Sequence, residues 1–269
     1  MTTGQYTVND LLRVMQRLRN PEDGCPWDLK QDFRSIVPST LEECYELAEA
    51  IEHGDYPHVA EELGDVLFQV VFYARLGEEQ GLFSFPDIVH TLVDKLLRRH
   101  PHVFADGEIE GVVAATLDVA EVKRSWEAIK RDERAARAQG GVLDDVPVAL
   151  PALPRAQKLQ KRAALVGFDW PDAAAVLDKL DEEQRELQEA MAAGSEAAIA
   201  DEMGDLLFTC VNLARQLGLD AEAVLRQASA KFEQRFRAME KSAAAGSADL
   251  RALTDTELDA LWRAAKVAR

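Results

Sequence analysis

A short acidic motif occurs twice in this chain, and it constrains the fold more than any other feature of the sequence. In the first copy, Glu-Glu-Cys-Tyr-Glu at residues 42–46 is followed after fifteen residues by Glu-Leu-Gly-Asp at residues 62–65. In the second copy, Glu-Glu-Gln-Arg-Glu at residues 182–186 is followed after fifteen residues by Glu-Met-Gly-Asp at residues 202–205. Both halves are offset by 140 positions (183 − 43 and 202 − 62), so the chain contains an internal repeat.

The spacing inside each motif predicts that its carboxylates converge. Glu43 and Glu46 are three residues apart and project from one side of a helix, as do Glu62 and Asp65. If the two helices pack antiparallel, each carboxylate raises the pKa of the others and opposes folding. A divalent cation that prefers oxygen ligands, most commonly Mg2+, would relieve this repulsion. The predicted metal ligands are Glu43, Glu46, Glu62 and Asp65 in the first copy, and Glu183, Glu186, Glu202 and Asp205 in the second.

A solvated acidic surface is the alternative interpretation of such a motif. A single copy in an acidic protein would favour that interpretation. Two copies in register, each beside apolar stripes with helical spacing, favour the metal site instead. The stripes of the first copy comprise Leu41, Cys44, Tyr45, Ala48 and Ile51, and then Leu63, Val66, Leu67, Val70 and Ala74.

Helical periodicity extends over most of the chain, and no convincing alternation of period two is present, so the sequence predicts an all-α fold. The order helix, loop, helix, helix, helix in the first copy predicts a four-helix unit, and the repeat predicts two tandem four-helix-bundle-like domains. Two capping boxes, Thr40 with Glu43 and Thr254 with Glu257, predict helix starts. We expect helices over about 9–20, 40–53, 57–80, 85–100, 117–139, 155–164, 172–193, 195–217, 220–241 and from 254 onward.

Glycine and proline mark the boundary between the two copies. Gly140 and Gly141, followed by prolines at positions 147, 151 and 154, predict a linker. The length of 269 residues suits two domains better than one. We therefore expect an N-terminal domain over 1–139, a linker over 140–154 and a C-terminal domain over 155–269.

Composition argues against several classes of function. The formal net charge of −17 opposes nonspecific binding to nucleic acid or to an anionic membrane, although metals could still recruit a small anionic substrate. The three cysteines lack CxxC spacing and no apolar run reaches about 18 residues, so we expect a cytoplasmic protein without a membrane anchor. No histidine completes a Glu-x-x-His pair, which disfavours a di-iron oxidase, and the absence of GxxxxGK[ST] disfavours P-loop release of γ-phosphate.

Each copy also carries cations and a tryptophan after its acidic motif. These residues are offset by 136 positions (231 − 95 and 262 − 126), which requires a four-residue deletion in the second copy. Lysine and arginine on one helical face suit phosphate oxygens, and a tryptophan one turn from a lysine suits a stacked base. Solvated surface and core packing are the alternatives, which the repetition weakens. The predicted substrate-binding residues are Lys95, Arg99, Trp126 and Lys130, and then Lys231, Arg235, Trp262 and Lys266.

These motifs, with two further segments, resemble the MazG family of nucleoside triphosphate pyrophosphohydrolases. The segments are Cys-Pro-Trp-Asp at residues 25–28 and Arg-His-Pro-His-Val-Phe at residues 99–104, and the resemblance covers nearly the whole chain in its tandem form. It implies an all-α NTP pyrophosphatase fold, a homodimer and Mg2+ dependence. It also implies cleavage of a nucleoside triphosphate to a monophosphate and pyrophosphate with loose base preference, in the clearance of aberrant or signalling nucleotides.

The resemblance assigns roles to individual residues. The metal ligands of the family fall on the eight carboxylates given above. Asp201 stands where the first copy has Glu61, and we leave this shorter side chain out of the ligand set. The nucleotide contacts of the family fall, in the second copy, on Lys231, Arg235, Trp262 and Lys266, with the segment from Lys179 to Glu182 beside them.

The acidic clusters also suggest a base for the reaction. Glu42 or Glu182, which by position would not bind metal tightly, would orient or deprotonate the attacking water. Both copies are complete by residue type, so the sequence does not distinguish an active copy from an inactive one. The alternative function is a non-catalytic regulatory module that binds metal and nucleotide without turnover.

Overall fold

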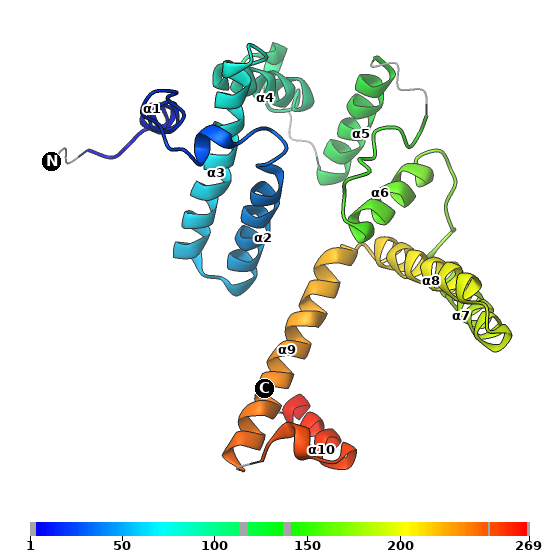
Figure 1. Ribbon diagram of the computed structural model, residues 1–269. Coiled ribbons are helices and arrows are strands. Elements are labelled where there is room, and N and C mark those ends of the chain that lie inside the picture. The colour runs from blue at the N-terminus through cyan, green and yellow to red at the C-terminus, as the bar shows by residue number, and fades with distance from the viewer. Residues whose placement is uncertain (1–3, 113–117, 137–140, 247, 268–269) are drawn as a thin grey trace. The chain divides into compact units, whose positions relative to one another are not determined.

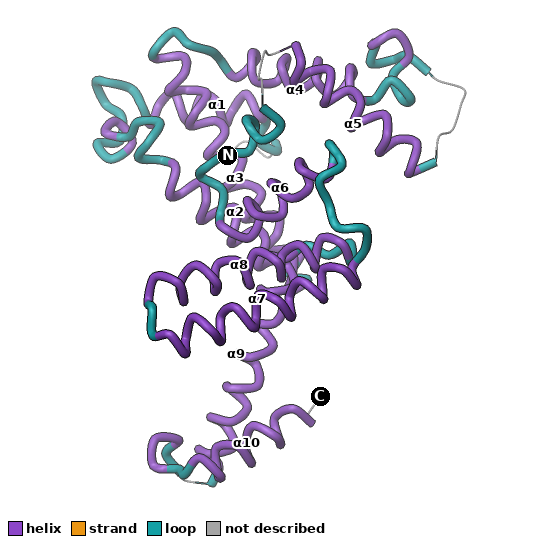
Figure 2. The backbone as a smooth tube through the Cα atoms, turned by 90° about the vertical axis from the view of Figure 1, so that its right-hand side faces the viewer, coloured by secondary structure: helices purple, strands orange, loops and turns teal. Residues whose placement is uncertain are grey.

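The computed structural model of this protein is all-α over the residues that it describes, as the sequence predicts (Figures 1 and 2). The chain divides into two compact units, Met1–Asp132 and Glu133–Arg269. Among the described helices, none combines the length and the apolar character that a membrane span requires. The described residues are 4–112, 118–136, 141–246 and 248–267.

The first unit is built around its long third helix. This helix, α3 (Tyr56–Glu79), pairs with α2 (Val37–His53) and also contacts α1 (Val8–Leu18) and α4 (Phe85–Arg99). A further helix, α5 (Val119–Ala136), follows α4 and crosses the boundary between the two units. Short 3-10 turns lie at Asp28–Lys30 and Ala105–Gly107.

The core of the first unit joins α1 and α3 to the segment that precedes α2. Met15 of α1, Ile36, and Val71, Phe72 and Leu76 of α3 are each at most 2% exposed and form one cluster. Burial of such a side chain contributes about 1.5–3 kcal/mol. This cluster fixes α3, and α3 carries half of the first acidic motif.

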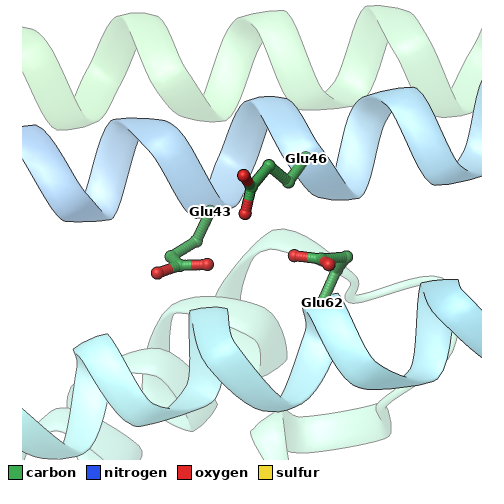
Figure 3. A group of neighbouring side chains, drawn as sticks. All are labelled: Glu43, Glu46 and Glu62. Carbon is green, nitrogen blue, oxygen red and sulfur yellow. The ribbon is translucent and has the colours of Figure 1, made fainter.

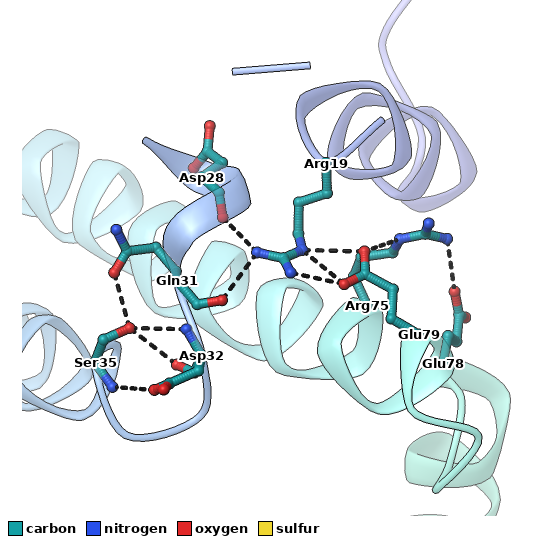
Figure 4. A network of polar contacts seen from close by, with 8 residues as sticks. All are labelled: Arg19, Asp28, Gln31, Asp32, Ser35, Arg75, Glu78 and Glu79. Atoms are coloured by element: carbon teal, nitrogen blue, oxygen red, sulfur yellow. Dashed lines mark hydrogen bonds and ion pairs between the residues drawn. The ribbon is translucent and has the colours of Figure 1, made fainter. Parts of the chain in front are cut away.

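A buried arginine ties three segments of the first unit together (Figure 4). Arg19, which is 6% exposed, donates to Glu79 at the end of α3, with 2.6 Å between its Nη2 and Oε2 of Glu79. It also donates to the backbone carbonyls of Asp28 and Gln31 in the loop before α2. Arg75, one turn before Glu79 on α3, donates to the same carboxylate, with 2.8 Å between its Nε and Oε1 of Glu79. The loop is therefore held in place by charge as well as by apolar packing.

The second unit contains a similar helix pair. The helices α7 (Ala173–Ala193) and α8 (Glu196–Gln216) pack along each other, and α6 (Ala152–Ala164) lies against α8. The long helix α9 (Ala221–Ala245) contacts α6 and α8 and then packs against α10 (Asp255–Val267). A 3-10 turn at Leu250–Ala252 separates the last two helices.

Part of the predicted linker is packed against the second unit. Asp145 accepts a hydrogen bond from Arg162 of α6, and Val146 is 6% exposed. The helix α6 begins at Ala152, inside the predicted linker, and Gly140 lies outside the described residues. The domain boundaries given above stay a prediction.

The helix starts test the two predicted capping boxes. The box of Thr254 with Glu257 is confirmed, since the backbone N–H of Thr254 donates to the Glu257 carboxylate at 2.8 Å and the N–H of Glu257 donates back to Oγ1 at 3.4 Å. The box of Thr40 with Glu43 is wrong, because α2 begins three residues earlier, at Val37. The Thr40 hydroxyl instead donates to the carbonyl of Ile36 at 3.0 Å and lies 2.9 Å from the hydroxyl of Tyr73.

We expect Glu79→Gln to lower the stability of the first unit at pH 7 by about 1–3 kcal/mol, because Arg19 then stays buried beside a neutral partner. Burial by itself raises the pKa of Glu79, but hydrogen bonds from Arg19 and Arg75 outweigh it and hold that pKa below its usual value. Such a group stabilises the fold above its unfolded pKa and loses this contribution as pH falls through the lower folded value. Below pH 4.5, the ordinary pKa of a glutamate, the thermal midpoint of the variant should therefore depend less on pH than that of the unmodified protein.

The control for this prediction is Asp23→Asn. Asp23 pairs with Arg17, and these two side chains are 56% and 75% exposed, so the change should alter stability by less than about 0.5 kcal/mol. Equal destabilisation by both variants, measured by circular dichroism, would contradict the role given to Arg19.

Candidate active site

Each acidic motif lies on a hairpin of two helices, α2 with α3 and α7 with α8. Gly54 and Gly194 end α2 and α7 with φ of 70° and 69°, the left-handed conformation that glycine adopts without strain. Asp55 and Ser195 then cap α3 and α8 by accepting a hydrogen bond from a backbone N–H three residues further on. The chain therefore reverses over a short turn and sets the two acidic faces opposite each other.

Three carboxylates of the first motif converge between α2 and α3 and point toward one another (Figure 3). Glu43, Glu46 and Glu62 each offer an oxygen within 4.8 Å of the other two. Glu62 is only 7% exposed, and its Oε1 lies 2.7 Å from Nε2 of His58. Its other oxygen, Oε2, is buried without a hydrogen-bond partner. A buried carboxylate oxygen of this kind requires a positively charged or donating ligand.

The crowding of these carboxylates has an electrostatic consequence. Burial raises the pKa of Glu43, and the negative charges of Asp65, Glu46 and Glu62 raise it further. Asp65 is therefore close enough to act on Glu43, although it does not belong to the group within 4.8 Å. Its assignment as a metal ligand stays a prediction.

The second motif forms the same cluster and adds a lysine to it. Glu183, Glu186 and Glu202 each offer an oxygen within 4.8 Å of the other two, and Glu183 is 4% exposed. The Nζ atom of Lys179, one turn before Glu183, lies 2.9 Å from Glu183 and 2.7 Å from Glu182. A protein cation thus already neutralises part of this cluster.

The lysine shifts the protonation of its neighbours. Its hydrogen bonds to Glu182 and Glu183 raise the pKa of Lys179, and the same contact holds the pKa of Glu182 below its usual value. Burial raises the pKa of Glu202, and the charges of Glu186 and Glu183 add to the effect. Glu182, a predicted base, is therefore a weaker proton acceptor while Lys179 holds it.

The two copies differ in the side chain that contacts the cluster. At the offset of 140, Ser39 takes the place of Lys179 in the first copy, and Ala198 takes the place of His58 in the second. The predicted site residues do not include His58, and they include Lys179 only as a nucleotide contact. The signal was present, because each lies four residues before a buried glutamate, Glu62 or Glu183, which is the spacing of neighbours on one helical face.

Both clusters have the donor set that a hard divalent cation requires. Their ligand atoms are carboxylate oxygens, which Mg2+ prefers. The orphaned Oε2 of Glu62 and the raised pKa values of Glu43 and Glu202 indicate negative charge that a cation would relieve. The residues present therefore fit a metal, held by Glu43, Glu46 and Glu62 or by Glu183, Glu186 and Glu202.

The predicted cations of the second copy lie on the last two helices. The Nζ atom of Lys266 lies 5.5 Å from the centre of the Trp262 ring, and Phe232 of α9 lies 5.4 Å from it. Lys231 and Arg235 lie on α9. The helix α10 packs on α9 and lies away from α7 and α8 in both views (Figures 1 and 2). One chain therefore brings Trp262 and Lys266 together, but not to its own acidic cluster.

The matching residues of the first copy lie on α4 and α5. Lys95 and Arg99 are one turn apart on α4, and Trp126 of α5 lies 5.2 Å from the ring of His100. The side chain of Lys130 lies outside the described residues. The roles of all these residues in substrate binding stay a prediction.

A family model described as the MazG nucleotide pyrophosphohydrolase domain matches this chain twice, at residues 31–104 and 172–239. This chain belongs to the MazG family. Each matched segment contains one acidic hairpin and most or all of the helix that follows it. The two hairpins are thus two MazG domains in tandem.

Relatives that match nearly the whole chain carry the family activity in their names. A protein of Escherichia coli strain K12 named nucleoside triphosphate pyrophosphohydrolase is 49% identical over 96% of this chain and 97% of its own length. A protein of Thermotoga maritima named nucleoside triphosphate pyrophosphohydrolase/pyrophosphatase MazG is 41% identical over 96% of this chain and 94% of its own length. An uncharacterized protein of Bacillus subtilis named YabN is 41% identical over 94% of this chain, which matches 50% of that protein.

We expect Lys179→Met to tighten Mg2+ binding at the second cluster, because it removes a cation that competes for Glu183. The gain should be about fivefold, equivalent to roughly 1 kcal/mol for a partly exposed ion pair. The reciprocal change Ser39→Lys should weaken Mg2+ binding at the first cluster by a similar factor. Titration of the thermal midpoint with Mg2+ measures both effects.

A matched control is Lys161→Met, which removes an exposed lysine on α6. It should leave the Mg2+ dependence of the thermal midpoint unchanged. An identical Mg2+ dependence in Lys179→Met and in the unmodified protein would show that Lys179 does not compete with the metal.

Proposed function

We propose that this MazG protein hydrolyses nucleoside triphosphates to nucleoside monophosphates and pyrophosphate with Mg2+ and with little preference for the base. The observation that carries the proposal is the pair of carboxylate clusters, each with a nearly buried glutamate, Glu62 or Glu183. Membership of the MazG family and the names of two relatives support the reaction. The choice of the bond between the α- and β-phosphorus follows from the family, since the residues by themselves suit either anhydride.

The carboxylates and the cationic side chains of each copy have different roles in this reaction. The clustered carboxylates of each copy would hold Mg2+, which would supply neutralisation of the polyphosphate and a bound water molecule of lowered pKa. Glu42 or Glu182 orients that water or takes its proton. Glu182 can accept a proton readily only after Lys179 has moved to another anion, and a substrate phosphate is such an anion. Lysines and arginines of the later helices hold the departing pyrophosphate.

We also propose that the protein acts as a homodimer. The apolar stripes on the acidic hairpins are open to solvent in the single chain, as shown by Leu63 at 53% exposure and by Leu207 at 54%. A groove of about 510 Å³ between α6 and α8 is lined by Gly204, Leu207 and Phe208. A Cβ atom on Gly204 would meet nothing within 4 Å, so a second helix has room to approach closely there.

A second copy would also complete the site. Because α9 and α10 leave the acidic cluster of their own chain, Trp262 and Lys266 are free to reach the cluster of a partner. Exposed apolar area of this kind typically marks an interface. The dimer therefore accounts both for the open stripes and for the separation of carboxylates from cations.

We further propose a cytoplasmic location and a housekeeping role in clearing aberrant or signalling nucleotides. Three free cysteines, Cys25, Cys44 and Cys210, support a reducing compartment. The role follows from the family, and the charge of −17 leads us to expect no nucleic-acid or membrane partner.

Incubation with ATP and Mg2+ should yield AMP and pyrophosphate. Replacement of Glu43, Glu62, Glu183 and Glu202 by glutamine in one protein should reduce turnover by more than about 100-fold, since all metal sites lose ligands. Product analysis by chromatography measures both.

The variant Glu49→Gln with Glu189→Gln, which changes exposed glutamates outside the clusters on α2 and α7, serves as the control and should keep its turnover. ADP and orthophosphate as first products would refute the reaction, whereas binding of ATP without products would favour the regulatory module.

The double variant Leu67→Glu with Leu207→Glu should shift the protein from dimer to monomer. A charge at these equivalent positions of α3 and α8 would be buried without a partner in the proposed interface, at several kcal/mol. Sedimentation velocity reads the oligomeric state. Val148→Glu, at a position that is 82% exposed, is the control and should leave the dimer intact. A dimer in both variants would exclude the acidic hairpins from the interface.

A further inference from the structure

The aromatic clusters of the two copies differ in their hydrogen-bonding groups. In the first unit, His100 lies edge-on to Trp126, with ring centres 5.2 Å apart at 80°, and lies 5.7 Å from the ring of His102. At the offset of 136, the second copy has Phe236 in place of His100 and Ala238 in place of His102. The cluster around Trp126 is therefore polar, whereas the cluster around Trp262 is a hydrocarbon surface with one lysine above it.

Two polar atoms of the first cluster are enclosed and unpartnered. They are Nε1 of Trp126 and Nδ1 of His102. The indole N–H can only donate, so it requires an acceptor. In the second cluster, the described residues Phe232, Phe236, Trp262 and Lys266 include no such atom. Unpartnered buried groups are rare in native proteins and call for a missing partner.

His100 supplies a fixed acceptor beside them. Its Nδ1 lies 2.7 Å from the backbone carbonyl of Leu96, and a carbonyl can only accept, so Nδ1 carries the proton. The other ring nitrogen of the neutral imidazole, Nε2, is then an acceptor. The cluster thus combines one obligatory donor, at Trp126, with an acceptor on His100, and Nδ1 of His102 accepts or donates according to its tautomer.

A base can reach the enclosed atoms only if Trp126 moves away from His100. Among the described residues, no pair of helices that includes α5 makes extensive contacts, and the contact of Trp126 with His100 joins α5 to the residue that follows α4. Binding of a base at this cluster therefore requires a displacement of Trp126.

We infer that His100, His102 and Trp126 form a base-reading subsite in the first copy, which takes the hydrogen-bonding edge of a nucleobase. The inference rests on the proposed function, because it assumes that the first copy binds a nucleotide. Each nucleobase arranges its donors and acceptors differently, and a site built to hydrogen-bond one arrangement rejects another. The first copy selects among bases by hydrogen bonds, and the second accepts all bases on the faces of Phe232 and Trp262.

The test uses the full chain with Glu183→Gln and Glu202→Gln, which weakens metal binding in the second copy only. Calorimetric titration uses the Mg2+ complexes of the α,β-methylene analogues of ATP, GTP, CTP and UTP. It gives four Kd values, because these analogues cannot be hydrolysed between the α- and β-phosphorus. We expect the best and worst bases to differ by about tenfold, the size of one hydrogen bond. Trp126→Phe, which keeps a ring but removes the N–H, should narrow this difference to about threefold or less.

Two further variants make the test decisive. His102→Ala, which installs the residue of the second copy, should also narrow the difference, and it serves if Trp126→Phe proves unstable in a thermal melt. Trp170→Phe, which changes a tryptophan outside both aromatic clusters, is the matched control and should leave the difference unchanged. Equal affinity for all four bases in the parent, or a difference that survives Trp126→Phe and His102→Ala, would overturn the inference.

The outcome is also separable from the proposed function. If the unmodified chain converts ATP to AMP and pyrophosphate but the parent variant binds no nucleotide, the subsite is refuted and the reaction stands. If the unmodified chain forms no AMP, the reaction is refuted, while base selectivity in the titration would still support the subsite.

Discussion

Repulsion between carboxylates is the constraint on which the rest of this structure depends. Two glutamates on one helix face a third on the next helix, across the short turn at Gly54 or Gly194. Such a hairpin is stable only if the remainder of the unit holds it, which the apolar cluster around Phe72 and the charge network of Arg19 do in the first unit. The fold thus holds repelling carboxylates close together at one site, and packing elsewhere in the unit compensates for their repulsion.

The duplication shows two ways of reducing this repulsion within one chain. The first copy brings an imidazole from the helix that carries Glu62, and the second brings an ammonium group from the helix that carries Glu183. The lysine brings a positive charge into the cluster, whereas the imidazole contacts Glu62 through Nε2, 2.7 Å from Oε1 of the carboxylate. Equal sets of ligands therefore do not imply equal sites, and the two domains start from different electrostatic states before any metal or substrate binds.

Much of the fold and of the acidic clusters follows from the sequence, because helical spacing alone decides which carboxylates share a face. The repeat at a fixed offset predicts both hairpins, and six of the eight proposed ligands do converge. The capping box at Thr40 fails because tertiary contacts with Ile36 and Tyr73 use the hydroxyl inside the helix. The stripe that includes Leu63 and Leu67 is apolar, yet these side chains are exposed in the single chain. A periodic pattern indicates that a helix face is apolar, but it does not show whether the residues that pack on that face belong to the same chain. The distance of α10 from the acidic cluster has the same origin, because spacing along a helix carries no information on how separate helices are placed.

The place where the second copy is shorter shows which parts of the domain tolerate insertions and deletions. Relative to α3, α8 ends three residues earlier (219 − 216), and the loop after it has four residues where the first copy has five. Together these account for the four-residue change in offset from 140 to 136. A single residue added inside α3 between Glu62 and Val71 would turn Glu62 by about 100° around the helix relative to the core residues and remove it from the cluster. The length difference between the two copies instead falls at the junction after the hairpin, where it displaces whole helices without rotating a ligand.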